Sequence, residues 1–273
     1  MSDAECVAFL QWALPKLNLR WAGYRKVRRQ VCKRIRRRLA QLELSDLAAY
    51  RAHLEENAAE WPVLSSLCTI TISRFYRDWG VWDTLRDEVL PAIAENARAE
   101  GDDTLRCWSI GCASGEEPYT MAILWQLALA DRYPELGLRG LATDADPHMI
   151  ERARAAQYPA ATLRDLPRDW LDRAFEPIGE TFRLRESFRR SVEIRHEDVR
   201  IATPSETFRV IFCRNVVCTY FDETLQQQTL QRVLDVLAPG GAFVLGRHER
   251  LPPTIALTPW FPERGIYGQP GGS

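Results

Sequence analysis

Residues 107–120 read CWSIGCASGEEPYT, and this stretch decides the fold of the chain. A hydrophobic run from Leu105 to Ile110 ends in a turn that carries Gly111 and Gly115, and a helix is expected to begin at Glu116. A strand, a glycine turn and a helix start form the nucleoside-binding corner of Rossmann-type α/β folds. The stretch therefore predicts a ligand at the carboxyl end of this strand.

The same turn indicates which ligand fits. Its glycines lack the G-x-G-x-x-G spacing of dinucleotide sites, and Glu116 and Glu117 stand at the helix start. Carboxylates there stabilise the helix dipole but repel a pyrophosphate. A cationic cofactor without phosphate fits better, and S-adenosylmethionine has a sulfonium, an ammonium and ribose hydroxyls. The turn therefore favours a methyl donor over NAD and disfavours a nicotinamide-linked oxidoreductase.

The composition is that of a globular protein, since 46% of the 273 residues are hydrophobic and 27% are charged. No apolar run reaches the roughly 18 residues of a membrane span, and the first residues lack a secretory pattern. We expect a cytoplasmic monomer that does not insert into membranes. The seven cysteines include no C-x-x-C pair and the four histidines are scattered, so we expect no metal site and reduced, buried thiols.

The periodicity of the chain divides it into two regions. Residues 1–75 predict a helical domain, because apolar residues recur every three or four positions between Trp21 and Leu42, and Ser45 is a suitable N-cap for a following helix. Residues 76–273 alternate strands and helices, which is typical of a parallel sheet covered on both faces. The segment 159–191 fits neither period, and we expect a small inserted subdomain there. The expected strands are 105–110, 139–143, 192–195, 210–213 and 242–245, and the expected helices are 82–98, 118–130, 147–156 and 225–237.

One helix of the first region is strongly basic. Nine of the fourteen residues from Arg25 to Arg38 are lysine or arginine, and none is acidic. Such a helix can follow a phosphate backbone, bind an acidic protein helix, or form a solvated surface. No aromatic platform for stacking bases accompanies it. We therefore favour an acidic protein partner over nucleic acid.

Asp144 ends the second predicted strand, in the segment LATDADP. An acidic side chain at this point accepts hydrogen bonds from both ribose hydroxyls of a bound nucleoside. The alternative is that Asp144 caps the next helix, and Asp146 is better placed for that. We therefore expect Asp144 to bind the ribose.

Polar residues also follow the third and fourth predicted strands. Asp198 and Val199 come after the third strand, where such folds place an adenine. Arg214, Asn215 and Tyr220 come after the fourth, at the carboxyl edge where ligands bind. One polar residue there is commonly a structural cap, whereas three indicate a reacting centre.

Four segments follow the basic helical domain: TISRFYRD (71–78), WSIGCASGEEPYT (108–120), ATDADPHMIERARAAQY (142–158) and IFCRNVVCTYFD (211–222). In this order and spacing they resemble the CheR-type chemoreceptor glutamate methyltransferases. The resemblance covers residues 24–267. It implies a Rossmann-like class I methyltransferase domain with a mostly parallel seven-stranded sheet. It also implies methylation of glutamate side chains in a protein, with S-adenosylhomocysteine as product.

The resemblance also implies roles for individual residues. Arg77 and Tyr220 match residues thought to shape the methyl-transfer site. The basic helix, with Arg28, Arg29, Arg36 and Arg37, matches the element thought to recognise acidic receptor helices. Together with Gly111 of the turn, the expected cofactor-binding residues are Thr71, Ser73, Arg77, Glu117, Asp144, Asp198, Val199, Arg214 and Asn215.

The sequence also departs from the family pattern. Thr71 and Asp198 stand where the family usually has asparagine, and residues 246–249 read GRHE instead of Gly-His-Ser-Glu. The segment VVCTYFD is one residue longer than the family's, so Tyr220 replaces the family tyrosine only if the loop absorbs that residue; otherwise Thr219 does. Two alternatives stay open: a related methyltransferase acting on another protein or a small carboxylic acid, and a non-catalytic module that senses S-adenosylmethionine.

Overall fold

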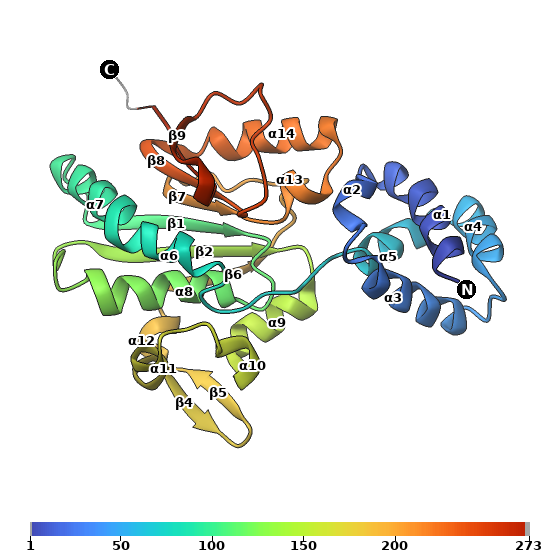
Figure 1. Ribbon diagram of the computed structural model, residues 1–273, viewed down its shortest axis with the longest axis horizontal. Coiled ribbons are helices and arrows are strands. Elements are labelled where there is room, and N and C mark those ends of the chain that lie inside the picture. The colour runs from blue at the N-terminus through green and yellow to red at the C-terminus, as the bar shows by residue number, and fades with distance from the viewer. Residues whose placement is uncertain (1, 271–273) are drawn as a thin grey trace. The chain divides into compact units, whose positions relative to one another are not determined.

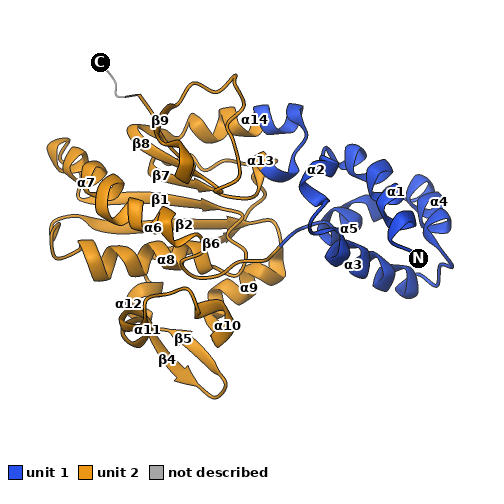
Figure 2. Cartoon of the chain, viewed as in Figure 1, with its two compact units in different colours: residues 1–70, 219–227 blue, residues 71–218, 228–273 orange. Residues whose placement is uncertain are grey.

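A computed structural model describes residues 2–270 of the chain (Figure 1). These residues form two compact units, coloured separately in Figure 2. Unit 1 comprises Met1–Ile70 and Thr219–Gln227, and unit 2 comprises Thr71–Cys218 and Gln228–Ser273. The sequence analysis places the boundary after residue 75, whereas the units divide after Ile70 and unit 1 takes a second, distant segment.

Unit 1 is built from helices. They are α1 (Asp3–Ala13), a 3-10 turn (Leu14–Leu17), α2 (Trp21–Tyr24), α3 (Arg28–Gln41), α4 (Leu47–Glu56) and α5 (Glu60–Leu67), joined by parts of α13 (Val217–Tyr220) and α14 (Glu223–Leu234). The expected N-cap Ser45 is wrong, because Asp46 caps α4 by accepting a hydrogen bond from the Ala49 N–H at 2.9 Å. The Ser45 hydroxyl instead donates to the Asp46 carboxylate.

The core of unit 1 uses the apolar stripe that the sequence predicts. Val31, Ile35 and Leu39 of α3 are buried at a spacing of one helical turn. Phe9 of α1 stacks on Tyr50 of α4 with 5.6 Å between the ring centroids. Burying one such apolar side chain stabilises the fold by about 1.5–3 kcal/mol. The basic residues of α3 are thereby directed away from the core.

The packing of α1 against α3 also brings two cysteines together. Cys6 and Cys32 form a disulfide with 6.1 Å between their Cα atoms, so the expectation that all thiols are reduced is wrong for this pair. The two residues are 26 positions apart, and no spacing motif marks them. The other five cysteines are free and buried. Burial raises the pKa of the Cys107 thiol to about 12, which keeps it inert at neutral pH.

Unit 2 contains a seven-stranded sheet in the order β6-β2-β1-β7-β8-β10-β9. The first five strands of that order are parallel, and β10 is antiparallel to both β8 and β9. This confirms the expected Rossmann-like, mostly parallel sheet. The strands are β1 (Thr104–Ile110), β2 (Gly137–Asp144), β6 (Val192–His196), β7 (Phe208–Cys213), β8 (Leu237–Leu245), β9 (Thr258–Phe261) and β10 (Ile266–Gly268).

Helices cover this sheet and bury its central strands. All six residues of β7 are buried, as expected of a strand with helices on both faces. Trp82 stacks on Phe212 of that strand with 5.4 Å between ring centroids. The helical elements are α6 (Trp79–Thr84), a π-helical turn (Leu85–Val89), α7 (Leu90–Ala99), α8 (Glu116–Leu124), a second π-helical turn (Trp125–Leu129) and α9 (Pro147–Ala155).

The segment that fits neither period forms a small antiparallel sheet in the order β3-β5-β4. Its strands have only three or four residues each, too few for a period of two to be visible in the sequence. Phe75, which precedes α6, packs edge-on against Tyr158 and Phe175 of this sheet. The elements are β3 (Gln157–Pro159), α10 (Ala160–Leu163), α11 (Arg168–Ala174), β4 (Phe175–Ile178), β5 (Thr181–Leu184) and α12 (Glu186–Arg189).

Across residues 2–270, every helix is too short or too polar to cross a lipid bilayer.

Candidate functional site

The candidate site lies at the carboxyl edge of the large sheet. Chain order reverses between β1 and β7, since β1 is followed by its neighbour β2 and β7 by β8 on the other side. Ligands bind at this switch point in open α/β sheets. In Figure 1 the arrowheads of β1 and β2 point to the same edge. Gly111, Asp144, Asp198 and Arg214 all follow or end strands at this edge.

The turn after β1 requires its glycine. Gly111 has a φ of +66°, and a Cβ at this position would lie 2.5 Å from a Val216 methyl carbon. The Cys112 N–H donates to the carbonyl of Thr143 at 3.0 Å, which joins the turn to the end of β2. Close packing and a left-handed backbone therefore both exclude a side chain at residue 111.

Asp144 is almost fully buried, with 6% of its surface exposed. Its Oδ2 accepts from the Ala113 N–H at 2.8 Å and its Oδ1 accepts from the Asp146 N–H at 2.9 Å. Desolvation raises the pKa of this carboxyl although both hydrogen bonds oppose the shift. Each oxygen keeps a lone pair for a hydroxyl donor. Asp146 caps α9 by accepting from the His148 N–H, as expected.

The two glutamates at the start of α8 have different surroundings. The Glu117 carboxylate accepts from the Ser109 hydroxyl at 2.8 Å and from Arg214 Nη1 at 3.2 Å. Glu116 is 2% exposed; its Oε1 accepts from the Ser114 hydroxyl, and its Oε2 has no hydrogen-bond partner among residues 2–270. Desolvation raises the pKa of both carboxyls, and for Glu117 the Arg214 guanidinium opposes the shift. Of the two, Glu117 is the glutamate that contacts the arginine after β7.

The linker before α6 reaches the same arginine. Arg214 Nη2 donates to the Asp78 carboxylate at 2.7 Å and to the Arg77 carbonyl at 3.2 Å. Arg77 Nη1 donates to the Ile72 carbonyl at 3.0 Å. The structure thus brings Arg77, Glu117 and Arg214 into one network. Thr71 and Ser73 lie earlier in this linker, and their contact with a cofactor stays a prediction.

The loops after β6 and β7 are held by ion pairs and hydrogen bonds. The Asp198 carboxylate pairs with Arg200 at 2.6 Å, so an adenine amine has to share it. Val199, the next residue, is buried. The Asn215 N–H donates to Glu249 Oε2 at 2.7 Å. The roles of Asp198, Val199 and Asn215 at a cofactor stay predictions.

Three residues of this site were missed by the sequence analysis. Asp78 is the last residue of the segment TISRFYRD, and it pairs with Arg214. Ser109 lies in β1 and donates to Glu117. Glu249 is buried, and its Oε2 accepts from the N–H groups of the loops after β7 and β8. Asp78 and Ser109 lie inside segments that carry the family resemblance, and matching those segments to the family is the signal that could have identified them.

Tyr220 belongs to unit 1, together with the rest of residues 219–227. Its ring lies 5.0 Å from that of Tyr24, centroid to centroid. Arg20 Nε donates to the neighbouring Thr219 carbonyl at 3.0 Å. Since the network of Glu117 and Arg214 belongs to unit 2, the role of Tyr220 in methyl transfer stays a prediction.

The basic residues of α3 fall into two groups. Arg28 pairs with Asp3 at 2.9 Å, and Arg38 pairs with Glu60 at 2.7 Å. Arg34 is half-buried and donates to the carbonyls of Leu67 and Thr69, whereas the remaining positions hold exposed cations, including Arg36. Of these, Arg29, Lys33 and Arg37 form no ion pair with any residue from 2 to 270. They are four residues apart in sequence, so they lie along one side of the helix.

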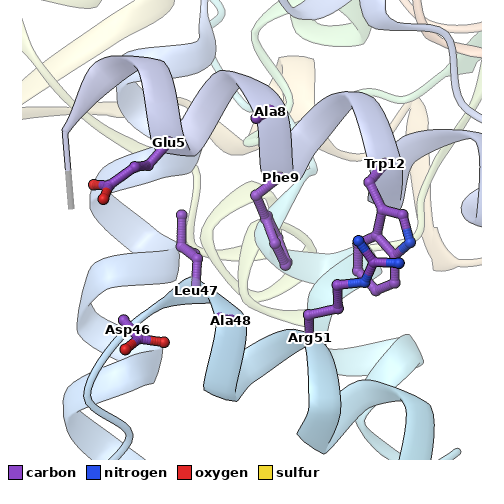
Figure 3. A pocket seen from close by; sticks show the side chains of 8 residues that line it. All are labelled: Glu5, Ala8, Phe9, Trp12, Asp46, Leu47, Ala48 and Arg51. Atoms are coloured by element: carbon purple, nitrogen blue, oxygen red, sulfur yellow. The ribbon is translucent and has the colours of Figure 1, made fainter.

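Unit 1 also has an open pocket of about 530 Å³ between α1 and α4 (Figure 3). Trp12 lies beneath the guanidinium of Arg51, 4.4 Å from the ring centroid to Cζ. The acidic residues of the pocket act as helix caps: Glu5 in the capping box of α1 and Asp46 at the start of α4. None of the expected cofactor-binding residues lines this pocket.

The residues at the carboxyl edge fit a cationic nucleoside cofactor. Asp144 and Glu117 are desolvated carboxylates, which attract an ammonium or sulfonium and accept from ribose hydroxyls. Arg214 Nε is buried without a hydrogen-bond partner in the described part of the chain. The turn lacks the glycine spacing of a phosphate-binding loop, and Glu116 and Glu117 stand at the helix start, so a pyrophosphate fits poorly.

Comparisons with known proteins agree with this geometry. Residues 71–261 match a family model described as "CheR methyltransferase, SAM binding domain". A chemotaxis protein methyltransferase of Listeria monocytogenes is 32% identical over 199 residues, which cover 73% of this chain and 72% of that protein. Those of Salmonella typhimurium and Escherichia coli are each 31% identical, over 91% of this chain and 84% and 85% of theirs.

Proposed function

This chain belongs to the CheR methyltransferase family and is an S-adenosylmethionine-dependent methyltransferase, and on that premise we propose that it methylates glutamate side chains of a chemoreceptor-type protein in the cytoplasm. The observation that carries the proposal is the network of Arg77, Glu117 and Arg214 at the switch point, in one unit, beside the buried carboxylate of Asp144. A basic helix in the other unit supplies a surface for an acidic acceptor protein.

The proposed roles at the cofactor follow from charge and position. Asp144 accepts from the ribose hydroxyls, and Glu117 holds the cationic methionyl portion. Gly111 lets the backbone approach the cofactor closely. Further contacts are proposed for Thr71, Ser73, Asp198, Val199, Arg214 and Asn215.

When bound, S-adenosylmethionine supplies a methyl group on a cationic sulfonium. A glutamate side chain with a pKa of about 4.3 is already ionised at neutral pH, so the acceptor needs no general base. The protein therefore acts by aligning the reactants and excluding water, and alignment supplies on the order of 7–11 kcal/mol. Arg77 orients the acceptor carboxylate through paired N–H donors. Tyr220 donates a hydrogen bond beside the path of the methyl group.

The exposed cations of α3 are proposed to bind acidic helices of the acceptor. Arg29, Lys33 and Arg37 carry charges that no described residue neutralises. Helices of the acceptor that present glutamates at the same spacing complement this stripe. Charge pairs at the rim of an interface act on association and on its salt dependence more than on the chemical step.

A second candidate keeps the chemistry but changes the acceptor to another protein or a small carboxylic acid. The observation that favours it is the segment GRHE, in which Arg247 and His248 depart from the family pattern and are both exposed on the loop after β8. Glu249 of the same segment holds this loop to the loop after β7, since its Oε2 accepts from the N–H groups of Asn215 and Gly246, each at 2.7 Å. The second candidate therefore places Arg247 and His248 at the acceptor.

The test uses the purified chain with radiolabelled S-adenosylmethionine and two acceptors, membranes that carry a chemoreceptor and a lysate of the source organism. We expect label on the receptor that alkali releases, because methyl esters hydrolyse in base. Label on another protein, or on a small molecule, contradicts the receptor assignment and supports the second candidate. Absence of label from all fractions, with cofactor binding shown by calorimetry, contradicts both.

A charge-reversal variant tests the basic surface in the same assay. Arg29→Glu, Lys33→Glu and Arg37→Glu combined are expected to raise KM for the receptor by about tenfold or more while leaving cofactor affinity unchanged. The matched control is Arg51→Glu, an exposed arginine on α4 of the same unit, which is expected to keep the original KM. An unchanged KM in the combined variant overturns the role of this surface.

A further inference from the structure

Arg214 lies where three segments of unit 2 meet: the end of β7, the first turn of α8 and the linker before α6. Its side chain is 4% exposed. Nη1 donates to Glu117 at 3.2 Å, and Nη2 donates to Asp78 at 2.7 Å and to the Arg77 carbonyl at 3.2 Å. A planar guanidinium can serve several acceptors at once in fixed directions. Arg214 therefore ties the linker to the sheet.

The linker needs such an anchor because its backbone is strained. Tyr76 and Asp78 have φ values of +56° and +60°, in the left-handed region that side chains disfavour. Each such residue costs about 1–3 kcal/mol and persists only where the surroundings hold it. The Arg77 carbonyl between them also accepts from Trp82 Nε1 at 3.0 Å. The peptide that carries Arg77 is thus held from two sides.

Asp78 lies between two arginines and is bound by one of them. Its Oδ2 is 2.7 Å from Arg214 Nη2 and 3.9 Å from Arg77 Nε. Only the 2.7 Å separation is short enough for a hydrogen bond, so the Asp78 carboxylate is hydrogen-bonded to Arg214 and not to Arg77. Arg77 is 35% exposed, and within residues 2–270 its guanidinium makes one hydrogen bond, from Nη1. Its remaining donors are therefore available to an acceptor carboxylate.

We propose that Arg214 is a positioning residue: it holds Asp78 and the Arg77 carbonyl so that the remaining donors of the Arg77 guanidinium face the acceptor in one orientation. This goes beyond the expectation that Arg214 binds the cofactor. It rests on the proposed function, because it assigns the acceptor to Arg77. Without Arg214 or the Asp78 carboxylate, the linker loses an anchor to the sheet and the Arg77 guanidinium is misplaced.

The kinetic test uses Arg214→Lys, which keeps a positive charge near Glu117 but cannot bridge the same acceptors. We expect kcat to fall about 100-fold, as misplacement of a catalytic group does, while the Kd for S-adenosylmethionine rises by a much smaller factor. The matched control is Arg209→Lys at the opposite end of β7, where Arg209 pairs with Glu100 and Asp102. That variant changes an arginine whose side chain is also buried, although its acidic partners are more exposed, and it is expected to keep kcat.

Asp78→Asn removes the carboxylate that accepts from Arg214, and so tests the contact between these two residues. It replaces Arg214→Lys if that variant does not fold. We expect it to lower kcat as well, and the double variant to be no worse than Arg214→Lys, because both changes remove one interaction. A Kd that rises as much as kcat falls in Arg214→Lys, with full activity in Asp78→Asn, overturns the proposal. That result means that Arg214 acts through cofactor binding alone and does not position Arg77.

Hydrogen exchange supplies a test that needs no acceptor. Exchange of the backbone amides of residues 71–80, measured by mass spectrometry with S-adenosylmethionine present, is expected to be about tenfold faster in Arg214→Lys than in the wild type and unchanged in Arg209→Lys. Unchanged exchange in Arg214→Lys overturns the proposal. If the wild type methylates no glutamate, the proposed function fails while the exchange data still decide whether Arg214 anchors the linker.

Discussion

The carboxylate of Asp144 accepts a hydrogen bond from the N–H of Ala113, with 2.8 Å between Oδ2 and N, across 31 positions of sequence. This bond joins the end of β2 to the glycine turn after β1. Ala113 has a φ of +50°, so the bond also supports a strained turn. The side chain proposed to bind the ribose therefore also shapes the turn that the cofactor approaches.

Asp144→Asn is expected to lower the affinity for S-adenosylmethionine about 10–100-fold, since hydrogen bonds to a charged group contribute about 1.5–3 kcal/mol. The amide also offers donors where Asp144 now accepts from Ala113 and Asp146. Calorimetric titration measures the effect. Asp146→Asn is the control, because asparagine also caps helices well. Equal affinity in Asp144→Asn and the wild type refutes the ribose assignment.

Arg77→Ala is expected to lower kcat about 100-fold with a smaller loss of cofactor affinity, because it removes the proposed donors to the acceptor carboxylate. Steady-state methylation of receptor membranes gives kcat, and calorimetry gives Kd. Arg74→Ala serves as control, since Arg74 in the same linker pairs with Asp165 at 3.0 Å. A fully active Arg77→Ala variant excludes Arg77 from the reaction.

Tyr220→Phe keeps the ring that packs against Tyr24 and removes only the hydroxyl. We expect kcat to fall about tenfold, as the loss of one hydrogen bond at the transition state does. Tyr24→Phe removes the hydroxyl of the partner ring and is expected to leave kcat unchanged. If Thr219→Val lowers kcat and Tyr220→Phe does not, Thr219 occupies the family tyrosine's place.

Glu116→Gln is expected to change how stability depends on pH. Desolvation raises the pKa of this carboxyl in the folded protein, so its contribution to stability is present below the unfolded pKa of about 4.3 and is lost as pH rises through the folded pKa. Glutamine does not ionise, so the variant does not lose stability at this position as the pH rises. Near pH 4 the two proteins should have similar free energies of unfolding, and the variant should gain about 1–3 kcal/mol relative to the wild type by pH 8.

Urea denaturation across this pH range measures the difference. Glu117 and Asp144 have pKa values raised in the same direction, but they are present in both proteins and cancel. Glu88→Gln, at an exposed position of unit 2, is the control and should show no such trend. A constant difference between Glu116→Gln and the wild type at all pH values contradicts the prediction.

Local patterns predicted the parts of the fold that depend on near neighbours. The run before Gly111 is β1, Asp146 is the cap of α9, and the stripe of Val31, Ile35 and Leu39 is the buried side of α3. Each of these follows from periodicity or capping within a few residues. The capping pattern gave the wrong residue at the start of α4, because Ser45 and Asp46 are adjacent and both residue types are good N-caps.

Other features have no local pattern. The Cys6–Cys32 disulfide depends on the packing of two helices, and the strands of the small sheet are too short to show a period. Periodicity does not separate Glu116 from Glu117 either. The resemblance alone singled out Glu117, and the structure shows that these adjacent helix residues point in different directions. Only Glu117 contacts Arg214, whereas Glu116 is buried with one oxygen unpaired.

By itself, the sequence determined the five parallel strands and the longer helices between them, the glycine turn and its acidic helix start, and through them the class of cofactor. Only the tertiary structure decided which groups meet: Arg214 contacts Glu117 from 97 positions away and Asp78 from 136. Periodicity and capping act over a few residues, whereas an ion network needs segments that the folded sheet brings to one edge. The contacts of Arg214 with Glu117 and Asp78 are therefore a property of the fold.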